Sequence, residues 1–112
     1  MTQKVESAEH QKLVRAMVKH MESEKFSELK AALDDYENPD LVNGFIPDVS
    51  GVKNDQSVIV EAETCDSYAA HKDQVSAFAK SGVTFWLIVP KVCLEEAKDF
   101  YKNQQNIRFW WL

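Results

Sequence analysis

Three carboxylates occur within residues 45–64, FIPDVSGVKNDQSVIVEAET, where Asp48 follows a proline and one residue separates Glu61 from Glu63. Clustered carboxylates repel one another, and burying them is costly unless a proton or a cation shares the site. Hard divalent cations such as Mg²⁺ prefer oxygen ligands of this kind. Either these side chains lie apart in solvent, or they form a site for a positively charged ligand.

The secondary structure around these residues decides between the two alternatives. Residues 46–52 and 57–64 have strand-like sequences, and the polar link KNDQ between them is typical of a hairpin. Because side chains alternate along a strand, Glu61 and Glu63 point to the same face. Pairing across the hairpin would bring Asp48 to the same end of the sheet. The sequence therefore predicts a three-carboxylate pocket for Mg²⁺ or Mn²⁺.

The segments before the hairpin predict one helix and one ambiguous element. Apolar residues recur at helical spacing from about residue 7 to 21 and predict an amphipathic first helix. Residues 25–36, KFSELKAALDDY, combine helix-favouring residue types with the strand-like alternation of Leu29, Ala31 and Leu33. Local propensity alone favours a helix there.

The segments after the hairpin alternate between helix and strand. Residues 66–82 predict a second helix, with Asp66 as its N-cap and Gly82 as its C-terminal stop. Residues 83–89, VTFWLIV, form an apolar run typical of a strand covered on both faces, which we expect in the middle of the sheet. A last helix over 91–105 and a closing strand at 107–112 complete the order. This order predicts an α/β domain with a mixed sheet flanked by helices.

Composition indicates a single domain, residues 1–112. The chain is 45% hydrophobic and 28% charged, and its formal net charge of −5 argues against a broad nonspecific nucleic-acid surface. The polar N-terminus and the lack of a long apolar run predict a soluble, cytoplasmic protein without a membrane span. Cys65 and Cys93 have neither CxxC spacing nor a Cys/His cluster nearby, so we expect reduced thiols rather than a zinc site or a disulfide.

Several enzyme classes lack their motifs in this sequence. There is no glycine-rich phosphate loop, no nucleophile elbow and no zinc motif. The histidines His10, His20 and His71 share no ligand spacing. Each is therefore interpreted as a surface or boundary residue.

The Pro47–Asp48 pair, followed by VEAE at residues 60–63, resembles the signature of the PD-(D/E)XK nuclease-like superfamily, which has the restriction-endonuclease-like fold. The resemblance covers nearly the whole chain. It implies an αβββαβ core plus a C-terminal helix and strand. On this basis we override local propensity and predict a strand at residues 26–33.

The resemblance also implies roles for single residues. Asp48 and Glu61 would bind the metal, with the backbone carbonyl of Ala62 nearby, and the three-carboxylate cluster makes Glu63 a further candidate ligand. Gln74, with Phe78 four residues later, is similar to the Gln-x-x-x-Tyr element of some branches, although phenylalanine lacks the tyrosine hydroxyl.

Glu63 stands where family members usually carry a lysine that positions or activates the attacking water. Some members have glutamate at this position and remain active. Lys53 and Lys72 are candidates for a relocated lysine. The first helix of this fold sometimes adds a glutamate, for which Glu6 and Glu9 are the candidates.

Two functions follow as hypotheses. One is a metal-dependent nuclease-like enzyme acting on nucleic-acid phosphodiesters with Mg²⁺ or Mn²⁺. The alternative is a catalytically inactive nuclease-fold domain that serves as a binding or assembly module. The C-terminal IRFWWL also predicts a homodimer interface, unless Phe109 and Trp111 pack inward against the last helix.

Overall fold

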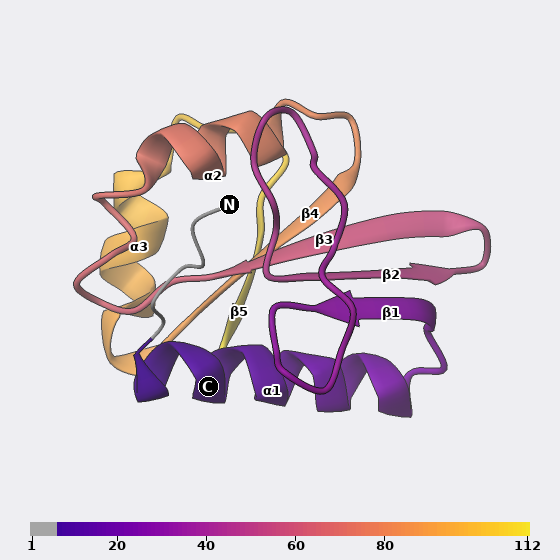
Figure 1. Cartoon of the computed structure of the whole chain (residues 1–112). Coiled ribbons are helices and arrows are strands. Elements are labelled where there is room, and N and C mark those ends of the chain that lie inside the picture. The colour runs from indigo at the N-terminus through magenta and orange to yellow at the C-terminus, as the bar shows by residue number, and fades with distance from the viewer. Residues whose placement is uncertain (1–6) are drawn as a thin grey trace.

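The computed structural model describes residues 7–112, and Figure 1 shows how their helices and strands are arranged. Their order confirms the predicted alternation around one sheet. The elements are α1 (Ala8–Ser23), β1 (Ser27–Ala31), β2 (Val49–Lys53), β3 (Gln56–Ala62), α2 (Lys72–Ala79), β4 (Thr84–Val89), the 3₁₀ turn η1 (Lys91–Cys93), α3 (Leu94–Phe100) and β5 (Arg108–Trp111).

The sheet is mixed, with the strand order β1-β2-β3-β4-β5. The first three strands pair antiparallel, and β3, β4 and β5 run parallel to one another. Parallel neighbours need long connections, which α2 and α3 provide. The apolar strand β4 therefore lies inside the sheet as expected, but the central strand is β3.

Helices cover both faces of this sheet (Figure 1). One apolar core lies between α1 and the sheet and contains Val58, Val60 and Ala62 of β3. The other lies against α2 and α3 and contains Ile59 of the same strand. Alternate residues of β3 thus enter opposite cores, so this strand is buried on both sides.

The segment at residues 26–33 forms a strand, as predicted against its helical propensity. The observed strand is shorter, Ser27–Ala31, and pairs with β2 through Ala31 opposite Val49. Glu28 has a positive φ of 53°, and the register shifts between Ser27 and Lys30. Pairing with β2 outweighs a local preference that is worth only a few tenths of a kcal/mol per residue, on the order of 0.5.

The connection between β3 and α2 differs from the prediction. Asp66 does not cap a helix, because α2 begins only at Lys72, after His71. Residues 64–71 instead form turns, in which the Thr64 amide donates a hydrogen bond to the Ser67 hydroxyl at 2.9 Å. The side chain expected to cap the helix therefore lies in a turn, and the N-cap is His71 instead of Asp66.

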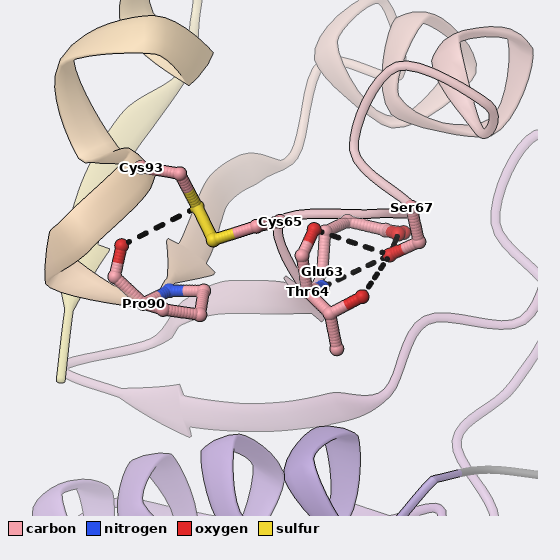
Figure 2. The surroundings of a disulfide bond; sticks show 6 residues. All are labelled: Glu63, Thr64, Cys65, Ser67, Pro90 and Cys93. Carbon is pink, nitrogen blue, oxygen red and sulfur yellow. Dashed lines mark hydrogen bonds between the residues drawn. A yellow bond between two sulfur atoms is a disulfide. The ribbon is translucent and has the colours of Figure 1, made fainter.

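The two cysteines form a disulfide, so the prediction of reduced thiols was wrong (Figure 2). Cys65 follows β3 and Cys93 ends η1 just after β4, and these strands are parallel neighbours. Parallel pairing places their carboxyl ends side by side, which brings the two Cα atoms to 5.8 Å. Separation along the sequence does not reveal this proximity.

Within residues 7–112, none of the helices is long and apolar enough to cross a membrane. The cytoplasmic location stays a prediction.

Candidate functional site

The three predicted carboxylates lie at the carboxyl end of β3, and all are almost fully buried. Asp48 immediately precedes β2, Glu61 is in β3, and Glu63 follows β3. Their exposed fractions are 1%, 0% and 1%, respectively. Ionised groups this deep need hydrogen bonds to replace the water that they lose.

Asp48 contacts β3 on both sides of Glu61. Its backbone amide donates to the Val60 carbonyl at 2.9 Å, and its Oδ2 accepts from the Ala62 amide at 2.9 Å. His10, from the first turns of α1, places Nε2 3.1 Å from the same Oδ2. These contacts fix Asp48 beside Glu61 at the end of the hairpin.

Glu61 is held by the predicted residue Gln74. The side-chain amide of Gln74 donates to Glu61 Oε2 at 2.6 Å, from a position in α2 that is itself 9% exposed. The two residues are far apart in sequence, and the packing of α2 against the sheet brings them together.

Glu63 has partners that the sequence did not indicate. Ser67 donates a hydroxyl hydrogen bond to Oε1, and Nδ1 of His71 lies 2.8 Å from the same atom. Where Glu63 is ionised, its oxygen accepts from Nδ1 of His71, which then carries the hydrogen. The other oxygen, Oε2, is buried and has no hydrogen-bond partner among residues 7–112.

The pKa of Tyr101, which lies just after α3, responds to the negative charge of this region. Burial raises the pKa of its hydroxyl, and the negative charges of Glu63 and Glu61 raise it further. The hydroxyl donates to the Tyr68 carbonyl.

A divalent cation such as Mg²⁺ needs several oxygen ligands at one point. Among residues 7–112, no group of three or more His, Cys, Asp and Glu side chains is placed to hold a metal ion. Mg²⁺ usually binds through only one or two carboxylates and completes its shell with water and substrate phosphate. Asp48 and Glu61 therefore stay the predicted pair of carboxylate ligands, and the Ala62 carbonyl stays a predicted ligand.

The remaining predicted site residues have different positions. Lys53 lies at the other end of β2 from Asp48 and pairs with Glu24 at 3.2 Å, so it is not a relocated lysine of this site. Lys72 is exposed at the start of α2, next to His71. Of the two lysines, Lys72 therefore remains the candidate for the relocated lysine.

Among the described residues, the first helix contributes a histidine, His10, to this region. Glu9 is exposed, and Glu6 lies outside the described residues. His10 is buried, and the Ser7 side chain that caps α1 accepts a hydrogen bond from its amide. The spacing of His10 to Leu13 and Val14 follows the apolar stripe of the helix, and this was the signal that could have identified it.

No protein-family model, curated protein or solved structure matches the chain.

Proposed function

We propose that this protein binds Mg²⁺ or Mn²⁺ at Asp48 and Glu61 and hydrolyses phosphodiester bonds of nucleic acid. The observation that carries the proposal is the hydrogen bonding of Asp48 to the backbone of Val60 and Ala62, the two chain neighbours of the equally buried Glu61. The αβββαβ order with a mixed sheet supports the restriction-endonuclease-like fold as part of the proposal.

The residues of the chain prepare this site before a ligand arrives. The Ala62 amide and His10 orient Asp48, and Gln74 orients Glu61, so neither carboxylate must be ordered on binding. A bound cation would polarise the phosphate and lower the pKa of the attacking water. Lys72 is exposed close to His71 and is the lysine available to contact a phosphate at this end of α2.

The hydrogen bonds of Glu63 favour the second candidate, a binding or assembly module without catalysis. Glu63 stands at the position of the usual lysine, cannot supply a positive charge, and already accepts hydrogen bonds from Ser67 and His71. If no lysine replaces the usual one, the site lacks the positive charge that helps to activate water for hydrolysis.

Metal-dependent stability tests the proposed site. A cation that binds only the folded state raises the melting temperature as its concentration increases. We expect Mg²⁺ or Mn²⁺ to stabilise the wild type, and Glu61→Gln to remove this effect because the amide lacks the charge. Glu95→Gln is the matched control, since Glu95 is 86% exposed on α3. The control should respond to the cation as the wild type does.

Cleavage of single- and double-stranded DNA and RNA separates the two candidates. Cutting that needs the cation and disappears in Glu61→Gln would support the enzyme. Cation binding without cutting by the wild type would favour the module, and the absence of cation binding would contradict the proposed metal site.

A further inference from the structure

We propose that the Cys65–Cys93 disulfide is a thiol-exchange site that controls the hydrogen bonds holding Glu63. The structural part of this inference stands alone, and its consequence for cation binding rests on the proposed function. Figure 2 shows the disulfide beside Glu63 and Ser67, on the same short piece of chain.

One connection carries both the disulfide and the partners of Glu63. Residues 64–71 join β3 to α2 and contain Cys65, together with Ser67 and His71. Cys65 lies two residues after Glu63 and two before Ser67, so a restraint on its sulfur also limits the positions of both neighbours. The disulfide therefore restrains Ser67 and His71, the two residues that contact Glu63 Oε1.

None of residues 64–71 is fully buried, and apart from the disulfide the connection is held by Tyr68, whose ring packs against Phe100, and by the contacts of Ser67 and His71 with Glu63. Its own turns are closed by hydrogen bonds between Thr64 and Ser67, and Asp66 is exposed. On the α3 side, the Tyr68 carbonyl also accepts a hydrogen bond from the Tyr101 hydroxyl. Segments with few buried contacts open locally at low free energy, so loss of the covalent tie should loosen this one.

The fold can accommodate Cys93 both in the disulfide and as a free thiol. Cys93 Sγ lies 3.6 Å from the Pro90 carbonyl oxygen, so the thiol formed by reduction could donate a weak hydrogen bond there without moving (Figure 2). Cys93 is buried, whereas Cys65 is partly exposed. An incoming thiolate would therefore reach the sulfur of Cys65.

The exchange needs a dithiol reductant. Its thiolate attacks Cys65 Sγ, the disulfide breaks, and Cys93 leaves as a thiolate that takes up a proton. The second thiolate of the reductant then attacks the mixed disulfide and releases Cys65, which also takes up a proton. The protein gains two electrons and two protons, and the dithiol becomes a disulfide.

Release of the connection changes what Glu63 can bind. In the bridged form, Ser67 and His71 occupy Oε1, while Oε2 is buried without a hydrogen-bond partner among residues 7–112. When the connection moves away, Oε1 is also free to accept a ligand. Glu63 could then join Asp48 and Glu61 around a cation, so the reduced protein should bind it more tightly.

The structural test compares the oxidised full chain, the chain reduced with a dithiol, and the double variant Cys65→Ser/Cys93→Ser. Alkylation and mass measurement first count the free thiols, with none expected after oxidation and two after reduction. Amide hydrogen exchange at residues 64–71 should become at least about tenfold faster in the reduced protein and in the double variant. Residues of β3 should keep their protection, which shows that the fold is intact.

Two results would overturn the proposal. One is a pair of alkylated thiols in the protein kept under oxidising conditions. The other is equal exchange at residues 64–71 in all three proteins, together with unchanged His71 ring resonances.

Mn²⁺ titration tests the consequence for the site. We expect an affinity at least about tenfold higher in the reduced protein and in the double variant, and the double variant should not respond to the reductant. Faster exchange without Mn²⁺ binding in any form would support the redox control of the connection and overturn the proposed metal site. Equal Mn²⁺ affinity in all forms would overturn the link between the disulfide and the cation.

Discussion

Each buried carboxylate of this protein has its own hydrogen-bond donors. A backbone amide and an imidazole serve Asp48, a side-chain amide serves Glu61, and a hydroxyl with an imidazole serves Glu63. Such bonds replace part of the hydration lost on burial, and bonds to charged groups contribute about 1.5–3 kcal/mol each. The carboxylates can therefore lie close together in the folded protein before a cation binds.

Tyr101 gives a test of the charge in this region at alkaline pH. Burial and the charges of Glu63 and Glu61 raise the pKa of its hydroxyl in the folded protein above the value of about 10 in the unfolded chain. A group with a raised pKa contributes stability below the unfolded pKa, and that stability is lost as the pH rises. We expect the unfolding free energy to fall less steeply above about pH 10 in Tyr101→Phe.

The measurement is urea unfolding between neutral and alkaline pH. At neutral pH, Tyr101→Phe should cost about 1 kcal/mol, because the hydrogen bond to the Tyr68 carbonyl is lost. Taking the difference between variant and wild type removes the contribution of the other titrating groups. Identical slopes for the two proteins at high pH would contradict the burial of the Tyr101 hydroxyl.

At the scale of elements, close packing of β2 against its neighbours gives a second test. A Cβ added at Gly51 would lie 3.0 Å from Leu29 Cδ2, 3.1 Å from Met21 Cε and 3.2 Å from Phe26 Cδ2. Overpacking of this kind typically costs about 1–3 kcal/mol, so we expect Gly51→Ala to be destabilised by that amount. Urea unfolding measures it, with Ser50→Ala on the same strand as the control. A Gly51→Ala protein as stable as that control would show that the neighbouring side chains adjust freely.

The helices and strands were predictable from the sequence where an apolar face or a turn sequence gives a clear local signal. The apolar stripe predicted α1, and KNDQ predicted the hairpin, whose Asn54 and Asp55 both have positive φ. The strand β1 could not be read from local propensity, because pairing with β2 decides it. The connection at residues 64–71 was missed because its turns depend on the Thr64–Ser67 hydrogen bonds and on a distant cysteine.

The candidate site was predictable only in part, for the same reason. Alternation along one strand is a local property, and from it the sequence predicted that Glu61 and Glu63 point to one face. Their partners come from other elements, and only packing brings them near. Gln74 was predicted through the family resemblance, whereas His10 and His71 had no spacing that linked them to the carboxylates.

At the scale of the whole molecule, the edge strand β5 remains the surface where we expect a second copy. Phe109 packs against the core beside α2 and α3, and Trp110 packs against the core beside α1. Trp111 does not pack inward as the alternative required, since it is 52% exposed and Leu112 is 53% exposed. An edge strand offers unpaired backbone groups, and exposed aromatic residues are typical of interfaces.

Light scattering at increasing protein concentration tests this prediction. We expect a dimer mass for the wild type and a shift towards monomer in Trp111→Ser, because the variant loses an exposed apolar contact. Leu41→Ser is the control, since Leu41 is 68% exposed in the segment before β2. A monomer mass at high micromolar concentration would rule out the dimer.

The disulfide also limits how far the chain can be stretched. Cys65 and Cys93 are 28 residues apart, and α2 and β4 lie between them. A fully extended chain reaches about 3.3–3.6 Å per residue, so this segment holds roughly 100 Å of contour length that the closed disulfide shields from tension. Force applied to the two chain ends would extend α1, β1, β2 and β3 on one side of the loop and α3 and β5 on the other, but it could not pull out α2 and β4. The mechanical length of the unfolded molecule therefore depends on the redox state of a single bond.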